Sequence, residues 1–250
     1  MERQEAEKIL TYALDLGERM LIRGAEVGRV EDTVTRILKA EGAQRVDVFI
    51  ITTSIVVTAH FDMGALTQTR RISGSSYDMT ALVHLNDLSR RICAGEVPLE
   101  VIGQRIQSIS REKTYDKPTM VLLYGFTSMV FSLFFGGSIL DALLSGLVGM
   151  LVRVLLWVFS TLRVPGLATT LLCAIIGGFF AHGFGWVGIP CSADKIAIGN
   201  IMLLVPGVGL TNSIRDMFTG DTVSGLLRFS ECLLTALALA FGFAVPSLLG

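Results

Sequence analysis

The chain has 250 residues, of which 51% are apolar and 17% charged, and its formal net charge is −1. Soluble domains carry about 25% charged residues, so polar side chains are scarce here. They are also unevenly spread, because residues 1–118 hold 33 of the 43 charged side chains and residues 119–250 hold 10. This division excludes a uniform soluble enzyme, a disordered chain and a wholly embedded protein. The near-zero net charge gives no reason to expect nucleic acid as a partner.

We therefore expect two domains, a water-soluble one over 1–118 and a membrane one over 119–250. The four cysteines are far apart and lack metal-ligand spacing, so neither a metal nor a disulfide framework is expected. No cofactor-binding motif is present. The charged N-terminal segment MERQEAEKIL has no apolar core, which predicts that no cleavable signal peptide is present.

The first domain has helical periodicity, then strand-like sequence, then helical periodicity again. Apolar residues at helical spacing predict helices over 5–22 and 25–42, and Gly42 suits the end of the second. Stretches rich in Val, Ile and Thr predict three antiparallel strands near 46–52, 54–61 and 66–72, with a turn at Asp62–Gly64. Two further helices are expected near 77–94 and 98–113. The fold class is an α+β domain in the order ααβββαα.

Polar side chains of this domain show no catalytic pattern. No nucleophile–base pair, glycine-rich phosphate loop or HExxH spacing occurs. We interpret the charged residues as solvated or structural, as surface charge usually is. The candidates weighed are Glu26, Arg29, Glu31, Asp32, His60 and His84.

The second half is a series of apolar blocks. About 20 apolar residues span a bilayer as a helix, and 119–136, 139–159 and 166–187 meet that length. Block 196–210 is short and interrupted, whereas 222–248 is long enough despite two charges. These blocks predict an all-α polytopic membrane domain of about five transmembrane helices, one broken at Pro-Gly.

Basic residues favour the cytoplasmic side of short loops. Arg111, Lys113 and Lys117 precede the first span, which places the N-terminal domain in the cytoplasm. If 196–210 spans the membrane the C-terminus lies outside, and if it re-enters the C-terminus is cytoplasmic.

The segment after residue 198 carries the strongest functional signal. Pro206 removes a backbone donor, and Gly207 and Gly209 permit unusual backbone angles. A broken helix cannot expose its backbone to lipid, and transporters place substrate sites at such breaks, although a simple proline kink is the alternative.

Polar residues surround this break. Ionisable groups inside spans are costly and usually face a protein interior or a pathway. Arg228 and Glu231 are three residues apart on the last span and can pair. A buried Glu231 could bind and release a proton, whereas Arg228 could simply reach the interface. The predicted transport or substrate-pathway residues are Asn200, Pro206, Gly207, Asn212, Arg215, Asp216, Arg228 and Glu231.

Two sequence regions resemble a known family. They are GERMLIRGAEVGRVEDTVTRILKAEG with the following VFIITTSIVV, and LLVPGVGLTNSIRDMFTGDTVSGLLR. The chain resembles the threonine/serine exporter (ThrE) family, and specifically its YjjP-like N-terminal component, along nearly its whole length. In the segment that matches the family pattern, Glu26, Arg29 and Glu31 suggest docking against the membrane half or a partner, or gating.

The resemblance implies proton-driven export of a small polar metabolite, such as threonine, serine or a dicarboxylate, across the plasma (inner) membrane. Full-length relatives carry a second membrane block, whereas this chain stops at Gly250. That departure resembles a split arrangement in which a separate small membrane protein supplies the other half; a homo-oligomer stays open.

Two other classes of function stay open at this point. A membrane-tethered hydrolase needs a nucleophile or metal site in 1–118, and none is found. A membrane-anchored metabolite sensor or scaffold needs no polar residues inside its spans, whereas this chain has them.

Overall fold

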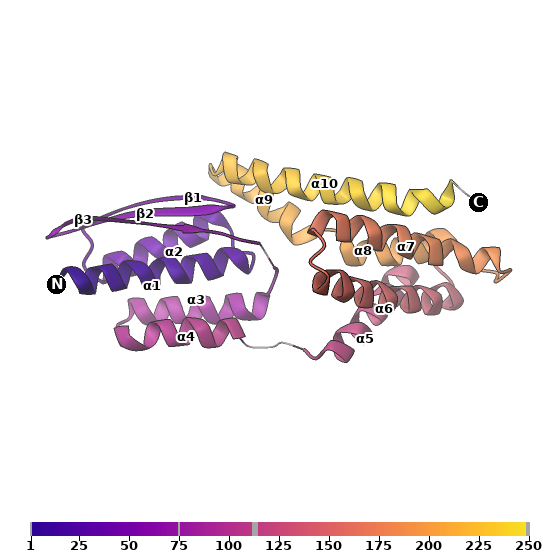
Figure 1. The fold of residues 1–250 in the computed structure, drawn as a ribbon, viewed down its shortest axis with the longest axis horizontal. Coiled ribbons are helices and arrows are strands. Elements are labelled where there is room, and N and C mark those ends of the chain that lie inside the picture. The colour runs from indigo at the N-terminus through magenta and orange to yellow at the C-terminus, as the bar shows by residue number, and fades with distance from the viewer. Residues whose placement is uncertain (1, 75, 112–114, 249–250) are drawn as a thin grey trace. The chain divides into compact units, whose positions relative to one another are not determined.

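The structure is a computed structural model, and it describes residues 2–74, 76–111 and 115–248 (Figure 1). Packing divides the chain into two compact units. The N-terminal unit comprises Met1–Thr114 together with Val208–Phe229, and the helical unit comprises Tyr115–Gly207 together with Ser230–Gly250. The predicted boundaries 1–118 and 119–250 stay a prediction. Packing groups the later segment 208–229 with the first unit.

The N-terminal unit contains the predicted order of elements. Two helices, α1 (Arg3–Ile22) and α2 (Val27–Ala40), precede three strands. The strands β1 (Arg45–Ile51), β2 (Ser54–Phe61) and β3 (Gly64–Arg71) form one antiparallel sheet in sequence order. Helices α3 (Met79–Cys93) and α4 (Leu99–Arg111) follow. The predicted end of the last helix at residue 113, and Lys113 itself, lie outside the described residues.

Turn chemistry sets the boundaries of these elements. Gly42 ends α2 with φ +94°, and Gly64 opens β3 with φ +121° directly after the predicted Asp62–Met63 turn. Both angles lie in the left-handed region, where glycine alone has no steric penalty. The register pairs Phe61 with Gly64, so β2 and β3 form a tight hairpin.

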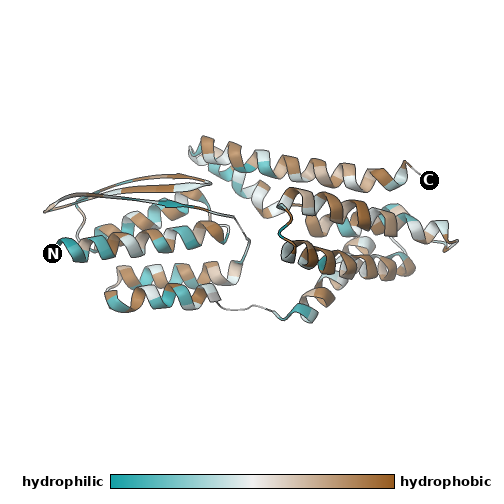
Figure 2. Ribbon diagram, in the orientation of Figure 1, coloured by the Kyte–Doolittle hydropathy of each residue, from teal (hydrophilic) through white to brown (hydrophobic). Residues whose placement is uncertain are grey.

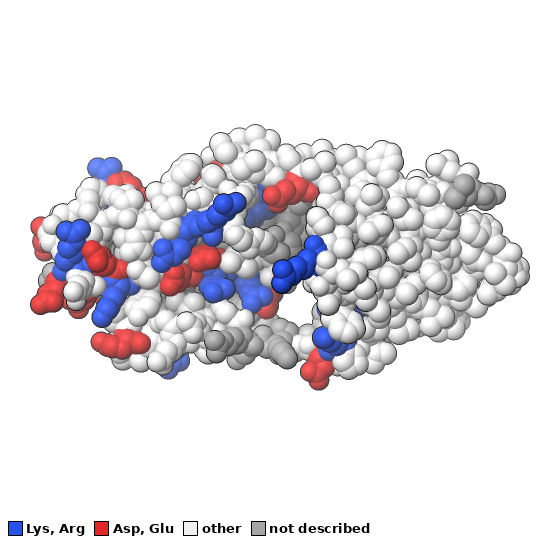
Figure 3. All heavy atoms as spheres, viewed as in Figure 1, with Lys and Arg blue, Asp and Glu red and all other residues white. Residues whose placement is uncertain are grey.

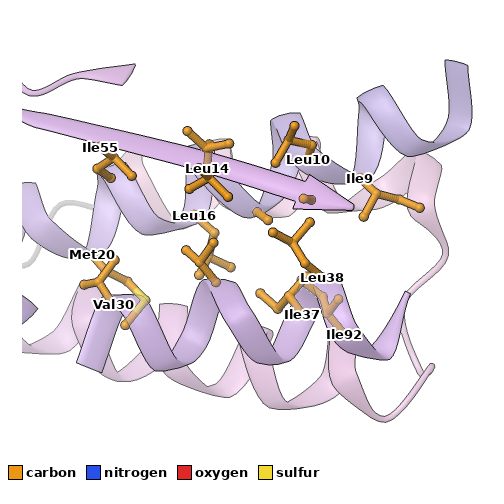
Figure 4. Packing of buried hydrophobic residues seen from close by; sticks show 14 of the residues in the cluster. Ile9, Leu10, Leu14, Leu16, Met20, Val30, Ile37, Leu38, Ile55 and Ile92 are labelled. Atoms are coloured by element: carbon orange, nitrogen blue, oxygen red, sulfur yellow. The ribbon is translucent and has the colours of Figure 1, made fainter. Parts of the chain in front are cut away.

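Helices α1 and α2 form the middle layer of this unit, between the sheet and the α3–α4 pair (Figure 1). Strand β2 alternates buried and half-buried residues, so every second side chain points at the helices. Figure 4 shows the resulting core, in which Leu10, Leu14, Leu16 and Met20 of α1 are fully buried. Side chains of α2 and of Ile55 on β2 close it from either side.

The helical unit contains α5 (Lys117–Phe134), α6 (Ile139–Thr161), α7 (Gly166–Trp186), α8 (Ala193–Leu204) and the C-terminal part of α10 (Thr222–Ser247). Within the described residues, α5, α6, α7 and α10 are each long and apolar enough to cross a membrane. Helices α8 and α9 (Gly207–Thr219) qualify together only as one bent pair, which makes up to five spans. Apolar colour covers these helices in Figure 2. The predicted sequence of an α+β domain followed by membrane helices is thus confirmed in outline.

Small residues allow the helices of this unit to pack closely. A Cβ atom on Gly149 would lie 2.7 Å from the Ser128 Cβ, and one on Gly199 would lie 2.7 Å from the Ser128 backbone oxygen. Such separations are far inside van der Waals contact, so these positions accept no side chain without movement. This close approach drives helix association in lipid, where burial of apolar surface contributes little.

Asp141 fixes the start of α6. Its carboxylate accepts hydrogen bonds from the Ser138 backbone N–H at 2.8 Å and from the Ser192 backbone N–H at 2.7 Å. Ser138 completes a capping box with it. The Asp141 carboxylate is buried, and its burial is tolerated because it satisfies orphan backbone donors.

The α1 core generates a stability prediction. Leu14 is fully buried, so Leu14→Ala removes packed methyl groups and should lower the free energy of unfolding by about 2–5 kcal/mol. Val83 is 64% exposed on α3, and Val83→Ala is the matched control. Thermal unfolding of the detergent-solubilised chain measures both. Equal midpoints for the two variants would contradict the packing described.

Candidate functional site

The predicted break in the membrane sequence is present. Helix α8 ends at Leu204, Pro206 lies in the gap, and α9 begins at Gly207. Gly207 and Gly209 permit unusual backbone angles but do not adopt them, because both lie within α9 and neither has a positive φ. The proline alone interrupts the helical hydrogen bonding, since it has no N–H to donate.

The N-terminus of α2 has no cap from its own sequence. The N-cap residue, Glu26, makes no side-chain capping bond, and the first turn contains no acidic residue. A helix leaves its first N–H groups unpaired and carries partial positive charge there. Asp216 on α9 supplies the missing acceptor, since its Oδ1 accepts from the Val27 N–H at 3.3 Å. A carboxylate 189 residues away thus caps α2.

Asp216 also belongs to a buried ion pair. Its Oδ2 lies 3.3 Å from Nη1 of Arg228 on α10. The side chains are 1% and 11% exposed, and neither of these two atoms has an aligned hydrogen bond in the described chain. Coulomb attraction therefore holds the pair. Removing one partner from such a pair leaves a buried charge uncompensated, which costs about 3–5 kcal/mol.

Further side chains bind the loop before α2. The Asn212 Nδ2 donates to the Gly24 carbonyl at 3.0 Å. Arg215 forms an ion pair with Glu26. We name this group the α2–α9 contact. Its members are Gly24, Glu26, Val27, Asn212, Arg215, Asp216 and Arg228.

A second carboxylate lies beside the same helix end. A Cβ atom on Gly28 would be 3.5 Å from Oδ2 of Asp221, so a larger side chain there would contact that carboxylate. Asp221 also acts on Glu31, one turn along α2. Partial burial raises the pKa of the Glu31 carboxyl, and the negative charge of Asp221 raises it further.

The structure brings together Glu26, Asn212, Arg215, Asp216 and Arg228 of the predicted residues. Arg29 lies elsewhere on α2, with its Nε donating to Oδ1 of Asn86 on α3 at 3.3 Å. Arg228 pairs with Asp216 instead of Glu231, which is exposed on α10. The described residues of this chain do not bury the Glu231 side chain, and its proton-binding role stays a prediction.

Asn200 is fully buried within the helical unit. Its Nδ2 donates to the Ile196 carbonyl at 2.8 Å and to Oγ of Ser145 at 3.2 Å. Its Oδ1 has no partner among the described residues. Ser145 in turn bonds Ser128 at 2.7 Å, so Asn200 completes a polar cluster between α5, α6 and α8.

Sequence reasoning missed two residues that fix the start of α10. Gly225 is one, because a Cβ there would lie 2.8 Å from the Ser213 carbonyl oxygen. Ser224 is another, since its hydroxyl donates to the Ile50 carbonyl at 3.0 Å and ties α10 to β1. The available signal was Gly225 itself, because a small residue within an apolar segment is typical of close helix packing.

Comparison with known proteins decides the family. The sequence profile of the ThrE family, described as "Putative threonine/serine exporter", matches residues 11–249. The chain belongs to the ThrE family. It is accordingly a multi-pass membrane transporter and not an enzyme, as predicted.

Individual relatives differ in length. "Probable succinate transporter subunit YjjP" of Klebsiella aerogenes is 25% identical over 96% of this chain and 93% of its own length. "Probable threonine/serine exporter" of Mycobacterium tuberculosis is 25% identical over 95% of this chain but 45% of its own length. "Pheromone-regulated membrane protein 10" of Pichia sorbitophila is 22% identical over 95% of this chain and 24% of its own length. No solved structure matches the chain.

The capping carboxylate predicts a local effect on α2. Asp216→Asn keeps the shape but removes the charge that caps Val27 and pairs with Arg228. Backbone amides 27–30 should then exchange with deuterium about 10-fold faster or more, because a capping charge and a buried pair are both lost. Asp87→Asn, on the exposed surface of α3, is the control. Unchanged exchange in Asp216→Asn would refute the capping role.

The Glu31 carboxyl predicts a pH dependence. A raised pKa means that the folded chain holds this proton more tightly than the unfolded chain does. Its stabilising contribution is full below the ordinary value of 4.5 and is lost as the pH rises through the folded pKa. Glu31→Gln should therefore unfold at a higher temperature than the parent at about pH 7.5, and the difference should shrink toward about pH 4. A difference that grows on acidification would contradict this.

Proposed function

We propose that this protein is one subunit of a proton-coupled exporter of a small polar metabolite in the plasma (inner) membrane. The substrate class is threonine, serine or a dicarboxylate, in keeping with one relative named as a succinate transporter subunit and another as a threonine/serine exporter. The N-terminal domain, residues 1–118, faces the cytoplasm, as the basic residues before the first span favour. Helices α8 and α9 together form one broken span, which brings the number of spans to five.

A separate small membrane protein completes the transporter. Lengths support this, because the chain spans 93% of a relative named as a subunit but 45% of one named as an exporter. The long relative has room for a second block within one chain. A second copy of this chain is the alternative partner, and co-purification with the small protein distinguishes the two.

The buried Asp216–Arg228 pair at the end of α2 is the observation that carries this proposal. Charges inside an apolar sequence persist when they line or control a pathway. Here the pair lies on the two helices that follow the Pro206 break, and it holds the loop before α2 through Val27. A movement of these helices would therefore act directly on α2 of the cytoplasmic domain.

Protonation of Asp216 supplies the coupling step in this proposal. A neutral carboxyl would lose its attraction to Arg228 and its hold on the partial positive charge of α2. The loop around Glu26 would then separate from α9, and the ion pair between Glu26 and the exposed Arg215 would break. Substrate would pass along Asn200, Pro206, Gly207 and Asn212, and Glu231 would take the proton on the exposed side of α10.

Flux measurements test the proposal. Proteoliposomes that contain this chain and its small partner should export labelled threonine, serine or succinate when a proton gradient is imposed. Asp216→Asn should lower the rate at least about 10-fold, because one charge of the pair is lost. Glu231→Gln should do the same if it relays the proton.

Asp87→Asn is again the matched control, since it removes an exposed carboxylate from α3. All variants must reach the same level in the membrane for the comparison to hold. Normal flux in Asp216→Asn would remove Asp216 from the mechanism. Flux that ignores the proton gradient would overturn the coupling.

A further inference from the structure

A positively charged groove lies between α2 and α3, away from the α2–α9 contact. Its volume is about 280 Å³. Charged side chains gather over the N-terminal unit on the face drawn in Figure 3, while the helical unit there is nearly free of them. Arginines dominate the lining, which consists of Arg29, Asp32, Arg36, Asn86, Ser89 and Arg90 together with Thr33 and Cys93.

Two of the arginines are held in place through one nitrogen each. Arg36 donates its Nε to Oδ1 of Asp32 at 2.8 Å, and Arg29 donates its Nε to Oδ1 of Asn86 at 3.3 Å. Asn86 is itself anchored, since its Nδ2 donates to the Leu82 carbonyl at 2.9 Å. These bonds orient the guanidinium groups and leave their terminal nitrogens available as donors.

The groove carries an excess of positive charge. Three guanidinium groups face one carboxylate, Asp32, which Arg36 already engages. Arg90 makes no ion pair with any other described residue. Like charges brought together in a recess repel one another, and bound anion removes that repulsion.

The remaining wall is neutral. Thr33 and Ser89 are buried hydroxyls that donate to the Arg29 and Asn86 carbonyls of their own helices. Partial burial raises the pKa of the Cys93 thiol, so it stays protonated and adds no competing negative charge. Donors in the groove are therefore cationic, and an oxyanion is the ligand that they match.

We infer that the α2–α3 groove binds a small oxyanion with two or more negative charges, either a phosphate compound or a dicarboxylate. Arginine forks bind both kinds of oxygen pair in the same bidentate manner. The site is separate from the α2–α9 contact and does not depend on the transport proposal. Both nevertheless lie on α2, so an anion in the groove fixes the same helix that Asp216 caps.

Calorimetric titration of the full chain in detergent tests this inference. The probes are pyrophosphate and succinate, with neutral succinamide as the control, all at constant ionic strength. At least one of the two anionic probes should bind and raise the unfolding temperature, because a ligand that binds only the folded state stabilises it. The stronger of the two identifies the ligand as a phosphate compound or a dicarboxylate.

Variants locate the site. Arg36→Gln with Arg90→Gln should weaken binding at least about 10-fold, because two charge-assisted donors are lost. Arg105→Gln removes the same charge from the exposed face of α4, outside the groove, and should leave binding unchanged. Arg90→Lys keeps the charge without the fork and should give an intermediate affinity even if the double variant fails to fold.

Two results would overturn the inference. One is that neither pyrophosphate nor succinate binds the parent chain at concentrations up to about 10 mM. The other is an equal affinity for the anion in the parent and in Arg90→Lys. If the double variant folds, its affinity must also equal that of the parent. Transport assays are not needed for either result, so a failed transport proposal leaves this test intact.

Discussion

The unpaired N-terminus of α2 is the constraint on which the rest of this structure depends. A helix of 14 residues begins here without a capping side chain or an acid in its first turn, so its first N–H groups need an outside partner. Asp216 provides it, and Arg228 makes the burial of that carboxylate tolerable. These contacts help to hold segment 208–229 within the N-terminal unit, although α10 is long and apolar enough to cross a membrane.

Much of the fold follows from local sequence. Period-2 patterns and the Asp62–Gly64 turn gave the hairpin to within about two residues, and apolar stripes gave α1 to α4, because these signals act over one or two turns of chain. The close packing around Gly149 also follows from local sequence, since small residues in apolar spans favour close approach of helices. The family match adds no geometry to this, because no solved structure accompanies it.

The partners of the charged residues could not be predicted from local sequence. Arg228 and Glu231 have the spacing of a helical pair, yet Arg228 forms its ion pair with Asp216 on α9. That pair compensates a buried carboxylate, and residue spacing along one helix does not predict a partner on another helix. The contact between Val27 and Asp216 joins residues 189 apart. Nothing in the sequence of α2 identifies Asp216 as the residue that caps this helix. Composition isolated ten charges in the second half, and folding groups four of them with the N-terminal unit: Arg215, Asp216, Asp221 and Arg228.

A double-mutant cycle between Asp216 and Arg228 tests the central claim most directly. Unfolding free energies of Asp216→Asn, Arg228→Met and the double variant are compared with the parent, with amide exchange at Val27 as a second readout. The account predicts a coupling of about 1–3 kcal/mol, in which the double variant is less destabilised than the sum of the single ones. Additive effects, with exchange at Val27 unchanged throughout, would contradict it.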